Sequence, residues 1–390
     1  MKRLRVGLST CPNDTFAFHH LLARTGPDGA DSIEWVLDDI QSLNERMAAG
    51  ELDIAKVSFA SAARHGDELT VLPVGAALGF GVGPVVLTAN GCADDRTDAR
   101  VLTPGADTTA HLLWRIFRPL STRVEHRVFS AIVPALERGD ADLGVCIHEA
   151  RFTYAERGLE LALDLGATWE AATGLPLPLG GLAVRRDLAR TDPGTVSAFV
   201  CAARASIRAA RADERAPLPT MRRYAQEFDD DVLLEHADLY VNDWTEELGS
   251  EGRAALRELA EKAHACGFTE RDVGLDPFEP DERLFHFVAP ADWERAQRHG
   301  EWQPPSLDSE GFVHLSFRHQ IEGTLDVHFT GVDEVLLVEV ELDDPGQLVI
   351  EPSRGGALFP HLRRHLRTAE AVRTHHVVRG PAGWTGLPPS

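Results

Sequence analysis

The sequence has little positive charge and no long apolar run. Lysine and arginine together number 39 against 61 acidic residues, which gives a formal net charge of −22. Nucleic-acid binding needs clustered positive charge on the protein, so this balance argues against a nucleic-acid partner. No stretch of about 18 apolar residues occurs, so no membrane-spanning helix is expected.

Cysteine is also scarce and scattered. The five cysteines show no CxxC spacing, which is typical of reduced thiols rather than of a disulfide framework. The opening MKRLRVGLST lacks the apolar stretch and cleavage site of a signal peptide. We therefore expect a cytoplasmic protein.

Along the first 190 residues, predicted strands alternate with predicted helices. A chain of 390 residues favours two or three folding units. Short apolar runs predict strands at 4–8, 33–37, 52–57, 71–74, 85–87, 101–102 and 143–147. Helical spacing of apolar residues predicts helices at 14–23, 42–49, 108–117 and 130–138. Parallel strands joined by crossover helices are expected.

The pattern of predicted elements changes twice further along the chain. Helical patterns alone occupy 193–268, and the stretch GLDPFEPDERL, rich in proline and acidic residues, is typical of a linker. Strand-like segments follow it. We therefore expect a first domain over 1–275, a linker over 276–282 and a small α+β domain over 283–390.

Polar residues follow several of the expected strands, where open α/β sheets bind ligands. These places are Ser9 to Asp14, Lys56 to Ser58, Pro104 to Ala110, and His148 with Glu149. Asp14 is suited either to a helix N-cap or to a ligand contact. Thr108 and Thr109 open an expected helix, where they either cap it or bind an anion.

Lys56 and His148 have the most unusual surroundings. Lys56 is one of three lysines and ends an apolar run, a position that suits a substrate carboxylate. His148 follows an apolar strand; it is either a satisfied structural histidine or a catalytic base, because an imidazole exchanges protons near pH 7. His361 and His365 lack the intervening acid of a metalloprotease pattern, so no zinc site is predicted.

Seven segments, in order and spacing, resemble the 1,4-dihydroxy-6-naphthoate synthases (MqnD). The resemblance covers residues 4 to about 268 and rests on STCPNDTFAFH, LDIAKVSFAS, GAALGFGVGP, PGADTTAHLL, GVCIHEARFTY, LGATWEAATGLPLPLGG and YVNDWTEELGSEG. Thr10 stands where these proteins usually carry proline.

The resemblance implies a periplasmic-binding-protein type II fold with two lobes around a cleft. Lobe 1 would span about 1–98 plus 190–275, and lobe 2 about 99–189. It also implies conversion of cyclic dehypoxanthine futalosine to 1,4-dihydroxy-6-naphthoate in menaquinone biosynthesis, a carbon–carbon lyase reaction with no metal or organic cofactor.

The resemblance further assigns roles to single residues. His148 would be the base that removes a substrate hydroxyl proton and starts a retro-aldol-like fragmentation. Substrate contacts would come from Lys56, Val57 and Ser58 of one lobe, and from three residues at a helix start of the other: Thr108, Thr109 and Ala110. The partner is thus a small molecule.

Within residues 283–378, the matching marks are His286, Trp293, GFVHLS at 311–316, Gln320, Glu351 and FPH at 359–361. They resemble a small domain family of unknown function, whose proposed core is similar to that of ADP-ribosyltransferases. His286, His314 and Glu351 would face one pocket there, or would only satisfy hydrogen bonds in a domain without activity. Fold analogy alone assigns no reaction.

Two other functions compete for the first domain. A non-catalytic solute-binding protein shares the implied fold, and the sister futalosine-pathway dehydratase shares both fold and pathway. The segments CPNDTF and IHEARFTY favour the synthase.

Overall fold

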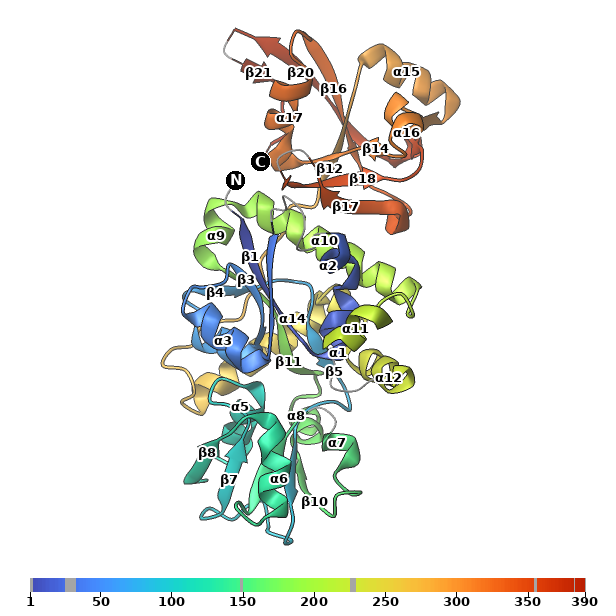
Figure 1. Cartoon of the computed structure of the whole chain (residues 1–390). Helices are drawn as coiled ribbons and strands as arrows, with labels where there is room; N and C mark the ends of the chain where they lie inside the picture. The colour runs from blue at the N-terminus through green and yellow to red at the C-terminus, as the bar shows by residue number, and fades with distance from the viewer. Residues whose placement is uncertain are drawn as a thin grey trace.

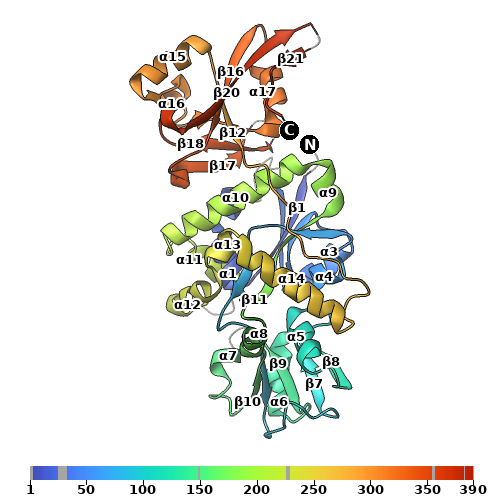
Figure 2. The same ribbon diagram turned by 180° about the vertical axis from the view of Figure 1, so that it is seen from behind.

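The computed structural model describes residues 3–24, 33–147, 150–224, 229–353, 356–381 and 383–389. It stacks three parts in a row, with lobe 1 between lobe 2 and the C-terminal domain (Figures 1 and 2). No helix in these ranges is long and apolar enough to cross a membrane.

Lobe 1 is built on a six-stranded sheet with the order β2-β1-β3-β11-β4, in which β5 also pairs with β11. Its first three strands are parallel, whereas β11 runs antiparallel to β3, β4 and β5. The strands are β1 (Leu4–Ser9), β2 (Ile33–Asp38), β3 (Ile54–Ser58), β4 (Leu69–Val71), β5 (Ala77–Gly79) and β11 (Leu177–Arg185).

Helices from both ends of the first domain surround this sheet (Figure 1). They are α1 (Pro12–Ala17), α2 (His19–Arg24), α3 (Ile40–Ala48), α4 (Phe59–Arg64), α9 (Arg186–Thr191), α10 (Pro193–Ala212), α11 (Leu218–Tyr224), α12 (Asp230–Tyr240), α13 (Asp243–Glu246) and α14 (Gly249–Ala265). The single helix predicted at 14–23 is therefore two helices, α1 and α2.

Lobe 2 is built on a five-stranded sheet with the order β10-β6-β9-β7-β8. Its elements are β6 (Val85–Thr88), β7 (Arg100–Thr103), α5 (Thr109–Phe117), β8 (Arg123–His126), η1 (Phe129–Ala131), α6 (Ile132–Glu137), β9 (Leu143–Cys146), α7 (Ala150–Thr153), β10 (Glu160–Asp164) and α8 (Leu165–Thr173).

The strands divide between the two sheets differently from the expected lobe boundaries at 98 and 190. β6 lies before residue 99 but pairs with β9 and β10 of lobe 2, and β11 lies before residue 190 but pairs with β3 of lobe 1. The chain thus crosses between the sheets at 80–84 and at 174–176. A short apolar strand has the same pattern in either sheet, so its partner cannot be read from periodicity.

The C-terminal domain is α+β, as expected. It holds a sheet of order β15-β12-β16-β20-β21, a three-stranded sheet β14-β18-β17, and the pair β13-β19. Its strands are β12 (Leu284–Val288), β13 (Glu301–Trp302), β14 (Val313–His314), β15 (Ser316–Phe317), β16 (Glu334–Val340), β17 (Leu348–Pro352), β18 (Leu358–Leu362), β19 (Leu366–Arg367), β20 (Ala371–Gly380) and β21 (Gly383–Thr385). Its helices are α15 (Pro290–His299), α16 (Pro305–Ser309), η2 (Arg318–Gln320), α17 (Ile321–His328), η3 (Pro345–Gln347) and η5 (Thr368–Glu370).

One hydrophobic core runs through lobe 1 and the C-terminal domain. Helix α10 touches β17, β18, η2 and η3, and its buried Phe199 and Val200 belong to the same apolar cluster as Val313 and Leu362. The backbone N–H of Asp281 donates to Ser197 Oγ of α10 at 2.9 Å, and Glu282 pairs with Arg204. The expected linker is therefore fastened to lobe 1.

Substitution of Gly194 tests the contact between α10 and the C-terminal domain. A Cβ added there would lie 2.2 Å from Cγ of His319 in the C-terminal domain, so Gly194→Ala should lower the free energy of unfolding by about 1–3 kcal/mol through overpacking. Denaturant unfolding of the full chain measures this.

Gly323→Ala is the matched control, because Gly323 lies in α17 with nothing within 4 Å of an added Cβ. Helix propensity favours alanine at both positions. Equal stability changes in the two variants would contradict the close contact between α10 and the C-terminal domain.

Candidate active site

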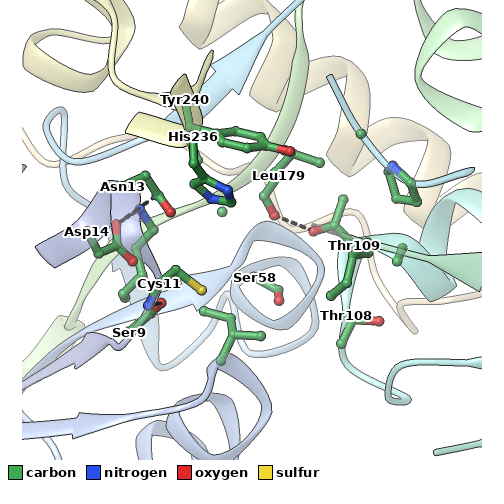
Figure 3. Close-up of a pocket in the computed structure, with 18 residues that line it drawn as sticks. Ser9, Cys11, Asn13, Asp14, Ser58, Thr108, Thr109, Leu179, His236 and Tyr240 are labelled. Carbon is green, nitrogen blue, oxygen red and sulfur yellow. Dashed lines mark hydrogen bonds and ion pairs between the residues drawn. The ribbon is translucent and has the colours of Figure 1, made fainter. Parts of the chain in front are cut away.

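A cavity opens between the two lobes at the carboxyl ends of β1 and β3 (Figure 3). Its empty space, counted out to the open mouth, is about 750 Å³. It is lined by Ser9, Cys11, Asn13, Asp14, Ile40, Lys56, Ser58, Ala77, Gly83, Pro84, Thr108, Thr109, Ala110, Ile147, Leu179, Gly180, His236 and Tyr240.

Among the described residues of that lining, the only charged ones form a buried ion pair. Lys56 Nζ donates to Asp14 Oδ1 at 2.6 Å and to the carbonyl oxygen of Gly75 at 2.9 Å. Both side chains are almost wholly buried, at 5% and 3% exposure. The pair is neutral overall, so Lys56 enters the cavity as a hydrogen-bond donor whose charge Asp14 already balances.

Of the two roles left open by its sequence, Asp14 does not have that of a helix N-cap. Helix α1 begins at Pro12 with Cys11 as its N-cap, so Asp14 lies inside the first turn instead of capping it. Its Oδ1 also accepts from Asn13 Nδ2 at 3.2 Å. Asp14 neutralises and positions Lys56.

Ser58 is held at the end of β3 by α3. Its backbone N–H donates to Asn44 Oδ1 at 2.9 Å, and Asn44 Nδ2 donates to Ser58 Oγ at 3.3 Å. Because Oγ accepts here, the Ser58 hydroxyl hydrogen is oriented elsewhere and can donate to a bound molecule.

The start of α5 supplies the facing wall. Thr108 is its N-cap: Oγ1 accepts from the His111 N–H at 3.2 Å and donates to the Gly105 carbonyl at 2.8 Å. Thr109 Oγ1 donates to the Leu179 carbonyl at 2.6 Å and accepts from the Ala60 N–H at 3.2 Å. Both hydroxyls are committed to the fold, and so is the His111 N–H. The backbone N–H groups that the helix start can offer to an anion are those of Thr109 and Ala110.

Five of the six expected substrate contacts line this cavity, and Val57 does not. Side chains alternate along a strand, so Lys56 and Ser58 face the cavity whereas Val57 points to the opposite side. There it is fully buried in the lobe 1 core.

His148 and Glu149 lie outside the described residues. Their chain neighbour Ile147, which follows β9, lines the cavity. The expectation that the His148 imidazole faces the cleft stays a prediction.

Two lining residues, His236 and Tyr240, were not singled out from the sequence. They lie four residues apart on α12, so they share one face of the helix, and their rings are 5.0 Å apart. The helical spacing of the pair was visible in the sequence, but nothing there indicated that α12 lies beside α1.

Of the two possibilities left open for the C-terminal candidate residues, His286 fits the second, in which they only satisfy hydrogen bonds. His286 is buried: its Nδ1 donates to the His314 carbonyl at 2.9 Å, and its Nε2 accepts from Trp302 Nε1 at 2.7 Å. Burial lowers the pKa of His286 to about 4. Both ring nitrogens are occupied, so His286 is a structural residue rather than a wall of a shared pocket.

His361 lies beside both Glu351 and His314. Its Nδ1 donates to Glu351 Oε1 at 2.8 Å, and its ring lies 5.3 Å from that of His314 and 4.0 Å from that of Phe312. Burial lowers the pKa of His361, although Glu351 acts in the opposite direction. Among the described residues, Nε2 of His361 has no hydrogen-bond partner.

A two-lobed α/β fold with a cavity between its lobes is the architecture of periplasmic solute-binding proteins. The alkanesulfonate-binding protein SsuA of Xanthomonas axonopodis shares it with a TM-score of 0.52, at 12% identity over 70% of this chain and 96% of that one. This likeness shows the periplasmic-binding-protein fold.

Residues 4–265 match the family described as "Menaquinone biosynthesis", and the chain belongs to that family. A 1,4-dihydroxy-6-naphthoate synthase of Thermus thermophilus is 40% identical over 68% of this chain and 96% of its own length. One of Streptomyces coelicolor is 40% identical over 68% and 94%. A solved protein of Archaeoglobus fulgidus is 32% identical, with a TM-score of 0.63 over 68% of this chain and 98% of that one.

Residues 287–374 match a second family, described as "Protein of unknown function (DUF952)". The two curated synthases match only 68% of this chain yet are covered almost completely. These synthases thus have almost no residues outside the matched region, whereas this chain carries a second domain there.

The buried pair leads to a stability prediction. Asp14→Asn leaves the Lys56 ammonium buried without its counter-charge, which should lower the free energy of unfolding by about 3–5 kcal/mol. Denaturant unfolding measures the loss. The double variant Asp14→Asn/Lys56→Met removes both charges and should recover much of it; a single variant as stable as the wild type would contradict the pair.

A second prediction concerns pH and His286. Its folded pKa of about 4 lies below the ordinary histidine pKa of 6.5, so the unfolded chain takes up the proton first as pH falls. The stability it contributes is complete above pH 6.5 and declines as pH falls toward about 4, by about 1.4 kcal/mol per pH unit.

Unfolding of the wild type and of His286→Gln across this window separates the contribution of His286 from that of other groups. The glutamine amide can donate to the carbonyl and accept from the indole, but it does not titrate. Equal slopes for the two proteins would show that His286 is not buried in its neutral form.

Proposed function

We propose that the chain is a 1,4-dihydroxy-6-naphthoate synthase, a carbon–carbon lyase that converts cyclic dehypoxanthine futalosine to 1,4-dihydroxy-6-naphthoate in menaquinone biosynthesis. The observation that carries the proposal is the inter-lobe cavity, which gathers Lys56, Ser58 and Thr108 to Ala110 from both lobes. The names of the two relatives at 40% identity support it. Action in the cytoplasm is part of the proposal.

His148 is the proposed base of this reaction. Removal of a substrate hydroxyl proton by a neutral imidazole starts the retro-aldol-like fragmentation, and formation of the aromatic naphthoate drives it. Ile147, the residue before it, lines the cavity, which supports this role. Closure of the lobes would exclude water around the base.

Dipoles, rather than a free cation, hold the substrate carboxylate in this proposal. Asp14 balances the charge of Lys56, and an ammonium has three N–H donors, of which Asp14 and Gly75 take two. The third donor, the Ser58 hydroxyl and the N-terminal N–H groups of α5 together offer a site for one carboxylate. This arrangement suits a protein whose net charge of −22 repels anions at long range.

Binding without chemistry is the rival function, since solute-binding proteins share the fold. Turnover separates the two. The full chain, incubated with cyclic dehypoxanthine futalosine, should release 1,4-dihydroxy-6-naphthoate, detected by chromatography and mass spectrometry. Tight binding with no product would overturn the proposal.

Two variants divide the roles within the site. His148→Ala should bind substrate but lose nearly all turnover, because a general base contributes about 10²- to 10⁴-fold to the rate. Ser58→Ala should instead raise KM, since it removes a donor to the bound carboxylate. Full activity in His148→Ala would remove that residue from its role, and an unchanged KM in Ser58→Ala would remove Ser58 from the carboxylate site.

A further inference from the structure

Helix α12 brings an imidazole into the cavity from a part of the chain distant from the other lining residues. His236 and Tyr240 line the space that Ser58, Thr109 and Asn13 also line (Figure 3). Among the described lining residues, His236 is the only histidine. An imidazole is the side chain best suited to exchange a proton near neutral pH.

The helix is fixed firmly enough to hold this ring in place. Leu233 and Ala237, on the neighbouring face of α12, are buried in the core of lobe 1. At its N-terminus the Asp229 carboxylate accepts from the backbone N–H groups of Asp231 and Val232. Just beyond its C-terminus, Asn242 Nδ2 donates to the Leu78 carbonyl at 2.8 Å, which ties α12 to β5.

The other polar groups around the His236 ring are poorer proton donors than an imidazolium. Among the described residues, the charged groups that line the cavity with it are Asp14 of α1 and Lys56 of β3, and these two are paired with each other. Tyr240 of α12 contributes a phenol beside the imidazole. A neutralised lysine and a phenol are poorer proton donors at neutral pH than an imidazolium.

The proposed reaction requires such a donor. When the base takes the hydroxyl proton, that C–O bond becomes a carbonyl and the adjacent carbon–carbon bond breaks. Its electron pair moves onto the carbonyl oxygen conjugated with the departing carbon, which becomes a hydroxyl only when it gains a proton. One proton is removed and one is added, and no oxidant or reductant is involved.

We propose that His236 is a second catalytic residue, which in its protonated form gives this proton to the oxygen where the negative charge collects. The inference rests on the proposed function. His148 and His236 then act as base and acid, and exchange with solvent restores both after product release. Donation at the developing oxyanion also lowers the barrier to bond cleavage.

Steady-state kinetics of the full chain with cyclic dehypoxanthine futalosine test the role. His236→Gln should lower kcat by about 100-fold or more with little change in KM, because a general acid acts in the transition state. Added imidazole should restore part of the turnover of His236→Ala. His65→Gln, which removes a histidine outside the cavity lining, is the matched control and should keep wild-type kinetics.

The wild-type pH profile gives a readout that does not depend on any variant folding. With a protonated acid at work, kcat should fall on the alkaline side, and His236→Gln should lose that limb. A wild-type kcat that stays level through the alkaline range overturns the role, as does an unchanged kcat in His236→Gln. A wild type without any turnover instead refutes the proposed synthase function itself, so the two failures are distinct.

Discussion

The buried ion pair between Lys56 and Asp14 is the contact on which the site depends. It joins the end of β3 to the first turn of α1, and through the Gly75 carbonyl it also holds the segment that leads to β5. Two charges taken from water are tolerated only when they are paired and hydrogen-bonded. The pair therefore fixes three segments of lobe 1 around one point and makes the cavity floor neutral.

A neutral floor determines how the cavity can bind an anion. The local donors are a serine hydroxyl, the remaining lysine N–H and the first N–H groups of α5, and α5 belongs to the other lobe. Binding of one carboxylate would thus engage both lobes at once. Closure and recognition would then be a single event, which is the advantage of a two-lobed fold for a reaction that must exclude water.

Much of this site could be predicted from the sequence because strand ends meet at one edge of a sheet. The strands around Lys56 and His148, and the helix start at Thr108, were visible as apolar runs followed by polar residues. The partner of Lys56 was not, because Asp14 is 42 residues away and its capping pattern gave a simpler explanation. His236 was not predicted as a cavity residue for a similar reason. Helical spacing shows which residues share a face, but not what that face packs against.

Prediction of the fold from the sequence was limited in the same way. Periodicity identified most strands of the first domain, but it did not predict β11, which runs antiparallel to β3. The lobe boundaries implied by the resemblance placed β6 in lobe 1, whereas β6 pairs with β9 of lobe 2. In the C-terminal domain, the sequence did not show that the imidazole beside Glu351 and the His314 ring is that of His361. Each error concerns a long-range partner, which sequence spacing does not encode. The shared core along α10 also makes the second domain a structural part of lobe 1, although its own chemistry is unassigned.

The central claim is that one carboxylate binds between Ser58 and the start of α5 beside a neutralised Lys56. A crystal structure of the full chain with bound 1,4-dihydroxy-6-naphthoate tests this most directly. We expect the carboxylate within hydrogen-bond distance of Ser58 Oγ and of the N-terminal N–H groups of α5, with the Lys56 to Asp14 pair intact. A naphthoate bound outside this cavity, or a Lys56 that leaves Asp14 to pair with the carboxylate, would contradict the account.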